Sequence, residues 1–429
     1  MLSRLRRRYW DASANAQMWR RALASGDDAA FRTVVLQDHV FRGRSGIQPV
    51  TGQARERAAA VAWLVHAQDA TPDGGVSYGY FPVLNSGGWE VSYPEETTGY
   101  IMTSLVDYAR ETGQADLIER ARRMALWEAE VQMPSGAVQG GKVTTPDKQT
   151  AAAFNTGMVL DGFVTVLADG DDPAIGKAAW SAADFLVGDL SPEGLFQTNG
   201  AFVSADKVKI YNVLCAWALF RYGALVGEAS YRSAAIAAVE GALKFMMPNG
   251  WLKENCLTEP RRPLTHTIGY SLQGILEVGV LADREDFVAA ARSGFDPLVQ
   301  HIQPNGFLAG RFDADWRPAV RWSCLTGSAQ LAIVGYRLGD IFGEDRYIRT
   351  AHRLVDFLKA VQRIGTGNPG IDGAIAGSLP VFGDYMKGGY PELGDQVPAG
   401  RPARSGAPSG HRMTPGDTAS GQDSRTAGR

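Results

Sequence analysis

Five short Pro-x-Gly segments recur along the chain at nearly constant intervals. They are "TPDGG", "MPSGA", "SPEGL", "MPNGW" and "QPNGF", with prolines at positions 72, 134, 192, 248 and 304, and a degenerate sixth copy, "GIDGA", follows around Asp372. Successive prolines are 56 to 62 residues apart. A fixed period of this length indicates a repeat architecture in which each copy is one supersecondary unit. The chain is therefore expected to contain about six structural repeats.

Each repeat predicts a helical hairpin. About twenty residues after each turn begins an almost uncharged helical pattern, with expected starts near Thr97, Asn155, Tyr211, His266 and Cys324. A second helix with charges along one face follows each of them, and a further helix of this kind, "ARERAAAVAWLVHAQ", precedes the first. Uncharged helices are expected inside and amphipathic helices outside. Six such outer helices favour a closed ring over an open solenoid.

This period, together with "YPEETTGY" and "SCLTGSAQLA", resembles the six-hairpin (α/α)6 toroids of bacterial glycan-processing proteins over roughly residues 55–392. The two quoted segments look like segments of proteins encoded with bacterial exopolysaccharide biosynthesis. The resemblance implies an all-α toroid and an oligosaccharide or polysaccharide substrate. It does not choose an activity, because such toroids include unsaturated glucuronyl hydrolases, other glycosidases, polysaccharide lyases and sugar epimerases.

The sequence divides into three parts. Residues 1–50 predict an N-terminal helical extension, residues 51–393 the toroid, and residues 394–429, rich in Gly, Pro, Ser and Arg, a disordered tail. The tail begins where a sixth inner helix is due, so the ring is expected to be incomplete, with a groove that exposes apolar residues such as Ile101 and Leu331. Either the N-terminal segment covers this gap or the chain is a truncated or frame-altered relative; the abrupt change in composition favours the second alternative.

Composition narrows the partners and the compartment. The formal net charge is -3, and the basic runs lie only at the two ends of the chain, which argues against nucleic acid as a partner. Three scattered cysteines without a CxxC pair argue for a reducing compartment and against a zinc site. No signal peptide or integral membrane segment is visible, so a cytoplasmic location is expected. The sequence indicates no metal and no cofactor, and it leaves the oligomeric state open.

The long loops before the inner helices should converge at one end of the ring and form a pocket into which helix N-termini point. In "SYPEETTGY", Glu95 and Glu96 precede the first inner helix. One carboxylate suffices to cap a helix, so the second remains unexplained. We interpret Glu95 or Glu96 as one member of a catalytic carboxylate pair opposite Asp73 or Asp313, which is the arrangement of a glycosidase.

A second set of residues supports another chemistry. His266 and Tyr270 are four residues apart, so they share one face of a helix. With Arg311 nearby they could abstract a proton beside the carboxylate of a uronic acid, as a lyase or an epimerase requires. The alternative is a hydrogen-bonded histidine at the helix cap.

Aromatic residues in the same loops suit a sugar, because aromatic faces stack on the apolar faces of pyranose rings. The predicted substrate-binding residues are Trp89, Tyr93, Tyr100, Trp251, Tyr270, Arg311 and Trp316. The alternative is that these side chains fill gaps between long loops. The leading hypothesis is a glycosidase-type hydrolase, followed by a uronic-acid lyase or epimerase and a non-catalytic glycan-binding subunit. A terpene cyclase is a weaker alternative, because "DADW" at residues 313–316 is a poor match to its acidic DxDD cluster.

Overall fold

The computed structural model describes Arg20 and residues 29–41, 54–83, 88–94, 96–200 and 207–392, without the side chains of residues 30, 38–41 and 96. The predicted tail from residue 394 and most of the predicted N-terminal extension lie outside these ranges. All statements below concern the described residues.

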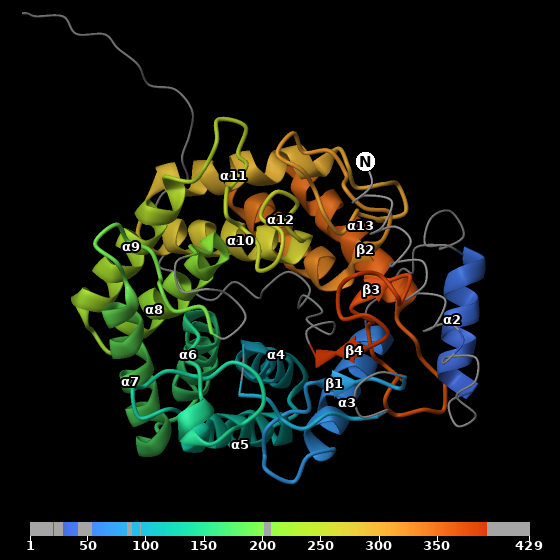
Figure 1. Cartoon of the computed structure of the whole chain (residues 1–429), viewed down its shortest axis with the longest axis horizontal. Helices are drawn as coiled ribbons and strands as arrows, with labels where there is room; N and C mark the ends of the chain where they lie inside the picture. Colours follow the sequence, from blue (N-terminus) through green and yellow to red (C-terminus); the bar gives the residue numbers. More distant parts are fainter. Residues whose placement is uncertain are drawn as a thin grey trace, which may run out of the picture. The chain divides into compact units, whose positions relative to one another are not determined.

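The helices form a ring with an inner and an outer layer (Figure 1). The inner helices are α4 (Glu96–Thr112), α6 (Ala153–Leu167), α8 (Leu214–Leu225), α10 (Thr265–Leu281) and α12 (Leu325–Phe342), and short 3-10 turns cover Pro146–Lys148 and Ile210–Val213. The outer helices are α3 (Ala54–Asp69), α5 (Asp116–Val131), α7 (Pro173–Asp189), α9 (Ala229–Leu243), α11 (Glu285–Val299) and α13 (Asp345–Val361). Each inner helix packs against the next inner helix and against its own outer helix. The expected all-α toroid of repeated hairpins is confirmed.

The two layers differ in burial as their composition predicts. Every residue of α6 up to Val166 is buried, and Asp161 is its one ionisable residue. By contrast, α13 buries one face, which includes Tyr347, Leu354 and Leu358, and exposes charged residues on the other. Burial of apolar side chains on both layers therefore gives the ring its main stabilisation.

The Pro-x-Gly turns attach each outer helix to the next one. The turn glycines all have a positive φ, between 79° and 94°: Gly74, Gly136, Gly194, Gly250, Gly306 and Gly373. At all of them except Gly74, a Cβ atom would collide with a backbone carbonyl of the following outer helix. Only glycine satisfies both conditions without strain. At Gly373 the carbonyl belongs to Ala59 of α3, so the sixth turn, predicted from "GIDGA", closes the ring.

Short strands occupy the place of the sixth inner helix. Strand β1 (Gly79–Tyr80) pairs antiparallel with β4 (Tyr390–Pro391), and β2 (Ser323–Cys324) pairs with β3 (Ser378–Leu379). Between α13 and Pro391 the described residues contain no α-helix. The residues after Glu392, where the sixth inner helix was expected to be missing, lie outside the described ranges.

The expected exposed groove is wrong. Ile101 and Leu331 are 3% and 0% exposed. The segment between α13 and Glu392 is itself apolar and buried, with Ile371, Val381 and Tyr390 at 1% exposure or less. These side chains contribute to the same core as the inner helices, so non-helical chain replaces the missing helix.

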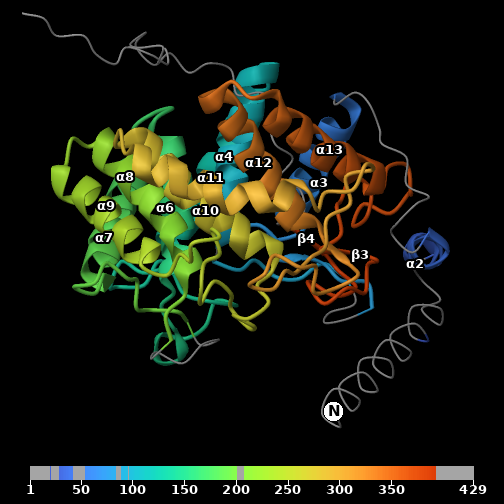
Figure 2. The same cartoon turned by 90° about the horizontal axis from the view of Figure 1, so that it is seen from above.

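Helix α2 (Ala29–Phe41) packs against this replacing segment (Figure 2). Phe31 is fully buried and contacts Phe382 edge-to-face, with 6.2 Å between the ring centroids. The Arg363 guanidinium donates a hydrogen bond to the Gln37 side chain. Part of the predicted extension thus packs against the sixth sector, and the favoured alternative of a truncated or frame-altered relative stays a prediction.

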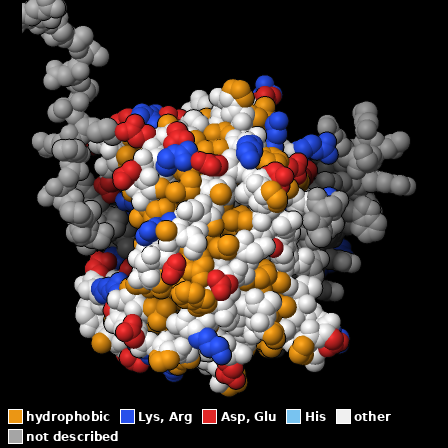
Figure 3. All heavy atoms as spheres, turned by 90° about the vertical axis from the view of Figure 1, so that its left-hand side faces the viewer, with side chains coloured by type: hydrophobic (Ala, Val, Ile, Leu, Met, Phe, Trp, Pro, Cys, Tyr) orange, Lys and Arg blue, Asp and Glu red, His pale blue; other side chains and the backbone are white. Residues whose placement is uncertain are grey.

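The outer surface of α7 and α9 differs from that of the other outer helices. Helix α7 has three charged residues, of which Asp189 is buried, and α9 has two, while hydrophobic side chains cover much of this side of the molecule (Figure 3). Trp180 is 46% exposed here and packs edge-to-face on Tyr231. Among the described helices, none has the combination of length and hydropathy needed to cross a bilayer.

Candidate functional site

The long loops gather at the N-terminal ends of the inner helices (Figure 2). The link from α4 to α5 takes three residues, whereas more than twenty separate α5 from α6. Isolated β-bridges tie neighbouring loops together, for example Ala152 to Asn199 and Leu264 to Arg311. We call this end of the ring the rim; it comprises the described residues of 72–100, 133–155, 191–214, 247–267, 303–325 and 363–392.

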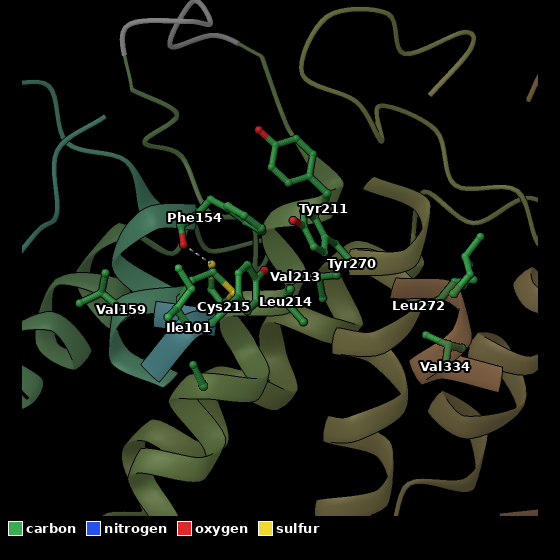
Figure 4. Packing of buried hydrophobic residues seen from close by; sticks show 14 of the residues in the cluster. Ile101, Phe154, Val159, Tyr211, Val213, Leu214, Cys215, Tyr270, Leu272 and Val334 are labelled. Atoms are coloured by element: carbon green, nitrogen blue, oxygen red, sulfur yellow. Dashed lines mark hydrogen bonds between the residues drawn. The ribbon is translucent and has the colours of Figure 1, made fainter. Parts of the chain in front are cut away.

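Four aromatic rings meet where the inner helices begin. Phe154 lies 5.2 Å from Tyr211 and 5.0 Å from Tyr270 between ring centroids, and Tyr270 stacks on Tyr100 at 6.0 Å. They come from α6, from the turn before α8, from α10 and from α4, and Figure 4 shows three of them side by side. All four are at most 9% exposed. The predicted substrate-binding residues Tyr100 and Tyr270 thus belong to one aromatic cluster at the ring centre.

His266 joins this cluster to the segment that replaces the sixth inner helix. Its ring lies 5.4 Å from that of Tyr270 and 4.6 Å from that of Tyr385, and its Nδ1 atom is 3.7 Å from Cys324 Sγ. Burial, aided by the positive charge of Arg311, lowers the pKa of His266 to about 3. Burial also raises the pKa of Cys324 to about 12. Both groups are therefore neutral near pH 7.

Two buried cations lie beside the cluster. The Arg311 guanidinium donates a hydrogen bond of 2.8 Å to the Arg262 carbonyl and lies 3.9 Å from Cys256 Sγ. Lys209 Nζ donates to the carbonyl of the same Cys256 at 2.8 Å. Neither cation forms an ion pair with a carboxylate of the described chain, although their exposed fractions are only 5% and 4%.

The surroundings also shift the pKa values of Lys209 and Cys256. Burial lowers the pKa of Lys209. Burial opposes ionisation of the Cys256 thiol, but backbone hydrogen bonds and the charge of Arg311 outweigh it and lower the pKa. Cys256 and Glu254 raise the pKa of Lys209 by less than burial lowers it, and no described carboxylate lies at ion-pair distance from either cation. A buried charge without such a partner is costly, so this basic site is suited to an anion.

Sequence reasoning missed Glu392. Its carboxylate accepts a hydrogen bond from the Thr97 hydroxyl in the first turn of α4, and it is 1% exposed. The positive end of the helix dipole favours an anion at this place. A signal was present in the sequence, since Tyr390-Pro391-Glu392 repeats Tyr93-Pro94-Glu95. It predicts a second acidic residue at the rim.

The first rim loop holds Trp89 and Tyr93 in different ways. Tyr93 is partly exposed and stacks on Tyr78, with 4.4 Å between centroids, while Lys142 lies over its ring at 5.8 Å. Lys142 also pairs with Glu90 at 3.3 Å. Trp89 packs between Trp63 of α3 and Tyr80, at 5.3 and 5.4 Å.

The predicted catalytic carboxylates fall into two groups. Glu95 and the side chain of Glu96 lie outside the described residues. Asp73 accepts hydrogen bonds from the Gly75 amide and the Ser92 hydroxyl, and Asp313 accepts from the amides of Asp315 and Arg317. Both aspartates therefore hold turns in this structure, and their catalytic roles stay predictions.

Trp251 and Trp316 pack against each other. Their ring centroids are 5.2 Å apart in an edge-to-face arrangement, and both residues are at most 6% exposed. Trp316 Nε1 donates to the Asn249 carbonyl. The structure thus places these two rings in the packing of the fourth and fifth loops, as the gap-filling alternative expected. Among the described residues, no cluster of three His, Cys, Asp or Glu side chains could hold a metal ion.

Comparison with known proteins identifies the fold. No protein-family profile matches the chain, and no curated protein matches its sequence. An unsaturated glucuronyl hydrolase specific for heparin superposes with a TM-score of 0.63 at 14% identity, over 80% of this chain and 94% of that one. A D-mannose isomerase gives 0.62 at 12% identity over 81% and 97%, and the cellobiose 2-epimerase of Bacillus thermoamylovorans gives 0.62 at 9% over 80% and 96%.

The chain has the (α/α)6 toroid fold of glycan-processing enzymes. The neighbours have this fold, and the expected resemblance is confirmed at that level. Their identities lie far below the range in which activity can be transferred, and their chemistries differ from one another. The fold therefore narrows the candidate activities, and the residues of the site must distinguish between them.

Proposed function

We propose that this protein is a glycosidase-type hydrolase that cleaves an acidic oligosaccharide at the rim. Glu392 is one catalytic carboxylate, and Glu95 or Glu96 supplies the second. The observation that carries this proposal is the placement of the Glu392 carboxylate at the N-terminus of α4, held by Thr97 beside the aromatic cluster. Two carboxylates flanking a glycosidic bond suffice for acid and base or nucleophilic catalysis.

The acidic character of the substrate follows from the basic site. Arg311 and Lys209 are buried, hydrogen-bonded to carbonyls and without a carboxylate partner in the described chain. A carboxylate or sulfate on the sugar would supply the missing charge. Heparin, named for one of the structural neighbours, is a glycan of this acidic kind. Partly exposed Tyr93, stacked on Tyr78, offers an aromatic edge to the sugar ring.

A uronic-acid lyase or epimerase is the second candidate, because His266 and Tyr270 are adjacent at the rim and an epimerase shares the fold. The lowered pKa of His266 weighs against it. An effective general base has a pKa near the working pH, and an imidazole with a pKa of about 3 binds a proton too weakly.

The test is a product analysis of the purified full chain with acidic and neutral oligosaccharides. Release of new reducing ends without ultraviolet absorbance supports hydrolysis. New absorbance from a conjugated double bond indicates a lyase, and a changed sugar without cleavage indicates an epimerase or isomerase. Binding without any product would favour the glycan-binding subunit, and each of these last three results overturns the proposal.

We also assign the activity to the processing of a bacterial polysaccharide or its precursor in the cytoplasm. The free, buried cysteines Cys215, Cys256 and Cys324 support a reducing compartment. Cell fractionation of a producing strain tests the location.

A further inference from the structure

The six outer helices can be aligned by hydrogen bonds of their C-terminal turns. The same bonds recur at Met133, Ser191, Met247 and Gln303. The amide of each donates to the carbonyl four residues on, and the carbonyl of each accepts from the amide of the turn glycine. Gln68, Gln132 and Gln362 each donate one hydrogen bond to the turn-glycine carbonyl and one to the next outer helix. The two patterns overlap after α5, where Gln132 precedes Met133, so together they give one register for all six outer helices.

One position in this register faces the core of every hairpin. It is occupied by Leu64, Glu128, Leu186, Ala242, Leu298 and Leu358, all at most 2% exposed. Five sectors therefore place an aliphatic side chain here, and α5 alone places a carboxyl group. Since leucine satisfies the packing elsewhere, packing does not explain Glu128.

The surroundings of Glu128 make this exception costly. The residue is 0% exposed, and neither carboxyl oxygen has a hydrogen-bond partner. Burial raises its pKa well above the usual value, and the Thr98 hydroxyl, which is itself fully buried and without a hydrogen-bond partner, opposes the shift. No charged group contributes to this shift from α4, α6 or α7, the helices that pack against α5. Burial without a counter-charge thus favours the neutral form of Glu128.

Thr98 connects Glu128 to the rim. It lies in the first turn of α4 next to Thr97, whose hydroxyl binds the Glu392 carboxylate. The same turn begins with Glu96. The first turn of α4 therefore lies between a buried acid behind it and the rim carboxylate in front of it.

We propose that Glu128 is a positioning residue, which holds the first turn of α4 from behind through Thr98 and so fixes the carboxylates of the rim. This inference rests on the proposed function for its catalytic consequence. The structural consequence, an ordered first turn of α4, does not depend on any substrate. Ionisation of Glu128 at high pH would place an uncompensated charge against this turn and loosen it.

The experiment compares Glu128→Leu, which restores the residue of the other sectors, with the neutral isostere Glu128→Gln. Leu186→Met, at the same register position in α7, is the matched control. Hydrogen exchange of the amides of residues 96–100 and steady-state kinetics are measured between pH 5 and pH 9. Thr98→Val serves as a second variant if Glu128→Leu does not fold.

Glu128→Leu should keep or raise the melting temperature, speed exchange in the first turn of α4, and lower kcat about tenfold or more with little change in KM. Glu128→Gln should retain most of the activity and of the amide protection. In this variant neither quantity should fall at high pH. Leu186→Met should have the same amide exchange in the first turn of α4 and the same kcat as the parent chain.

Wild-type exchange in both Glu128→Leu and Thr98→Val would overturn the proposal. If the parent chain turns over no glycan, the proposed function fails, and the exchange result still decides the role of Glu128. Faster exchange in Glu128→Leu without loss of an established activity would overturn the link to the rim.

Discussion

The two ends of the inner-helix ring differ in whether their buried charges are paired. At the end opposite the rim, Asp161 of α6 pairs with Arg221 of α8, and Glu277 of α10 pairs with Arg337 of α12 at 2.6 Å. At the rim, Arg311 and Lys209 have no carboxylate partner within the described ranges. The paired charges join neighbouring helices and need nothing further.

This difference separates a structural role from a functional one within the same helices. A buried pair is complete in the folded protein, whereas an unpaired buried cation becomes favourable only when an anion binds. The rim is also the end with the long loops, the helix N-termini and the neutral His266. We therefore expect substitutions at the rim to change activity and substitutions at the opposite end to change stability.

The largest expected effect is at Glu392. The substitution Glu392→Gln keeps a hydrogen-bond acceptor for Thr97 but removes the charge, so kcat/KM should fall about 100-fold or more with a nearly unchanged melting temperature. Initial rates on the acidic oligosaccharide that the parent chain turns over provide the measurement.

Glu277→Gln is the matched substitution at the opposite end, where Glu277 is also buried. It should lower the melting temperature and leave kcat/KM within twofold, because Arg337 loses its counter-charge far from the rim. Equal losses of activity in the two variants would remove the distinction between the two ends.

The next effect is the difference in stability between substitutions of Arg337 and Arg311. Arg337→Met leaves the Glu277 carboxylate buried without its partner and should cost roughly 2–3 kcal/mol, less than the ~3–5 kcal/mol of a fully buried pair because Arg337 is 29% exposed. Arg311→Met removes an unpaired cation and should be neutral or stabilising. Chemical denaturation measures both.

For Arg311→Met, activity on acidic oligosaccharides should nevertheless fall, mainly through a higher KM, while any activity on neutral ones is kept. Destabilisation of Arg311→Met by as much as Arg337→Met would show that Arg311 belongs to a structural network instead of an anion site.

A smaller effect is expected from His266. Its pKa is lowered to about 3 in the folded protein from an ordinary value near 6.5, so the unfolded chain binds more protons between these values. The contribution of His266 to the unfolding free energy therefore rises with pH from 3 to 6.5. His266→Gln should flatten the slope of the unfolding free energy against pH in this window. An unchanged slope would show that His266 is not held neutral by burial.

The sequence predicted the repeat because the repeat is local. The Pro-x-Gly turns, the uncharged inner helices and even the degenerate turn at Gly373 follow from glycine geometry and apolar periodicity. The sixth sector could not be predicted in this way. It contains the pairing between β1 and β4, which are some 300 residues apart, and no local pattern specifies such a pairing.

The candidate site shows the same limit. His266, Tyr270 and Tyr100 were found because they lie on helix starts, and the structure brings them together. Sequence reasoning could not see that Trp251 and Trp316 cover each other, since composition does not reveal which faces of a ring are occupied. Glu392 was missed because this part of the sequence was interpreted only as the place where a sixth inner helix is due.

The smallest expected effect lies on the surface at the end opposite the rim. Arg57 of α3 pairs with Glu111 near the end of α4, at 2.7 Å in one of its two contacts, and Glu111 is half exposed. The hydrogen bond to Arg57 lowers the pKa of Glu111. Solvent screens such a pair, so Glu111→Gln should cost less than about 1 kcal/mol and should leave activity unchanged. The residual loss should shrink in high salt, and denaturation at two ionic strengths measures it. A loss as large as that of Arg337→Met would mean that exposed pairs contribute to ring closure as much as buried ones. The end opposite the rim would then owe its stability to all of its ion pairs and not mainly to its two interior pairs.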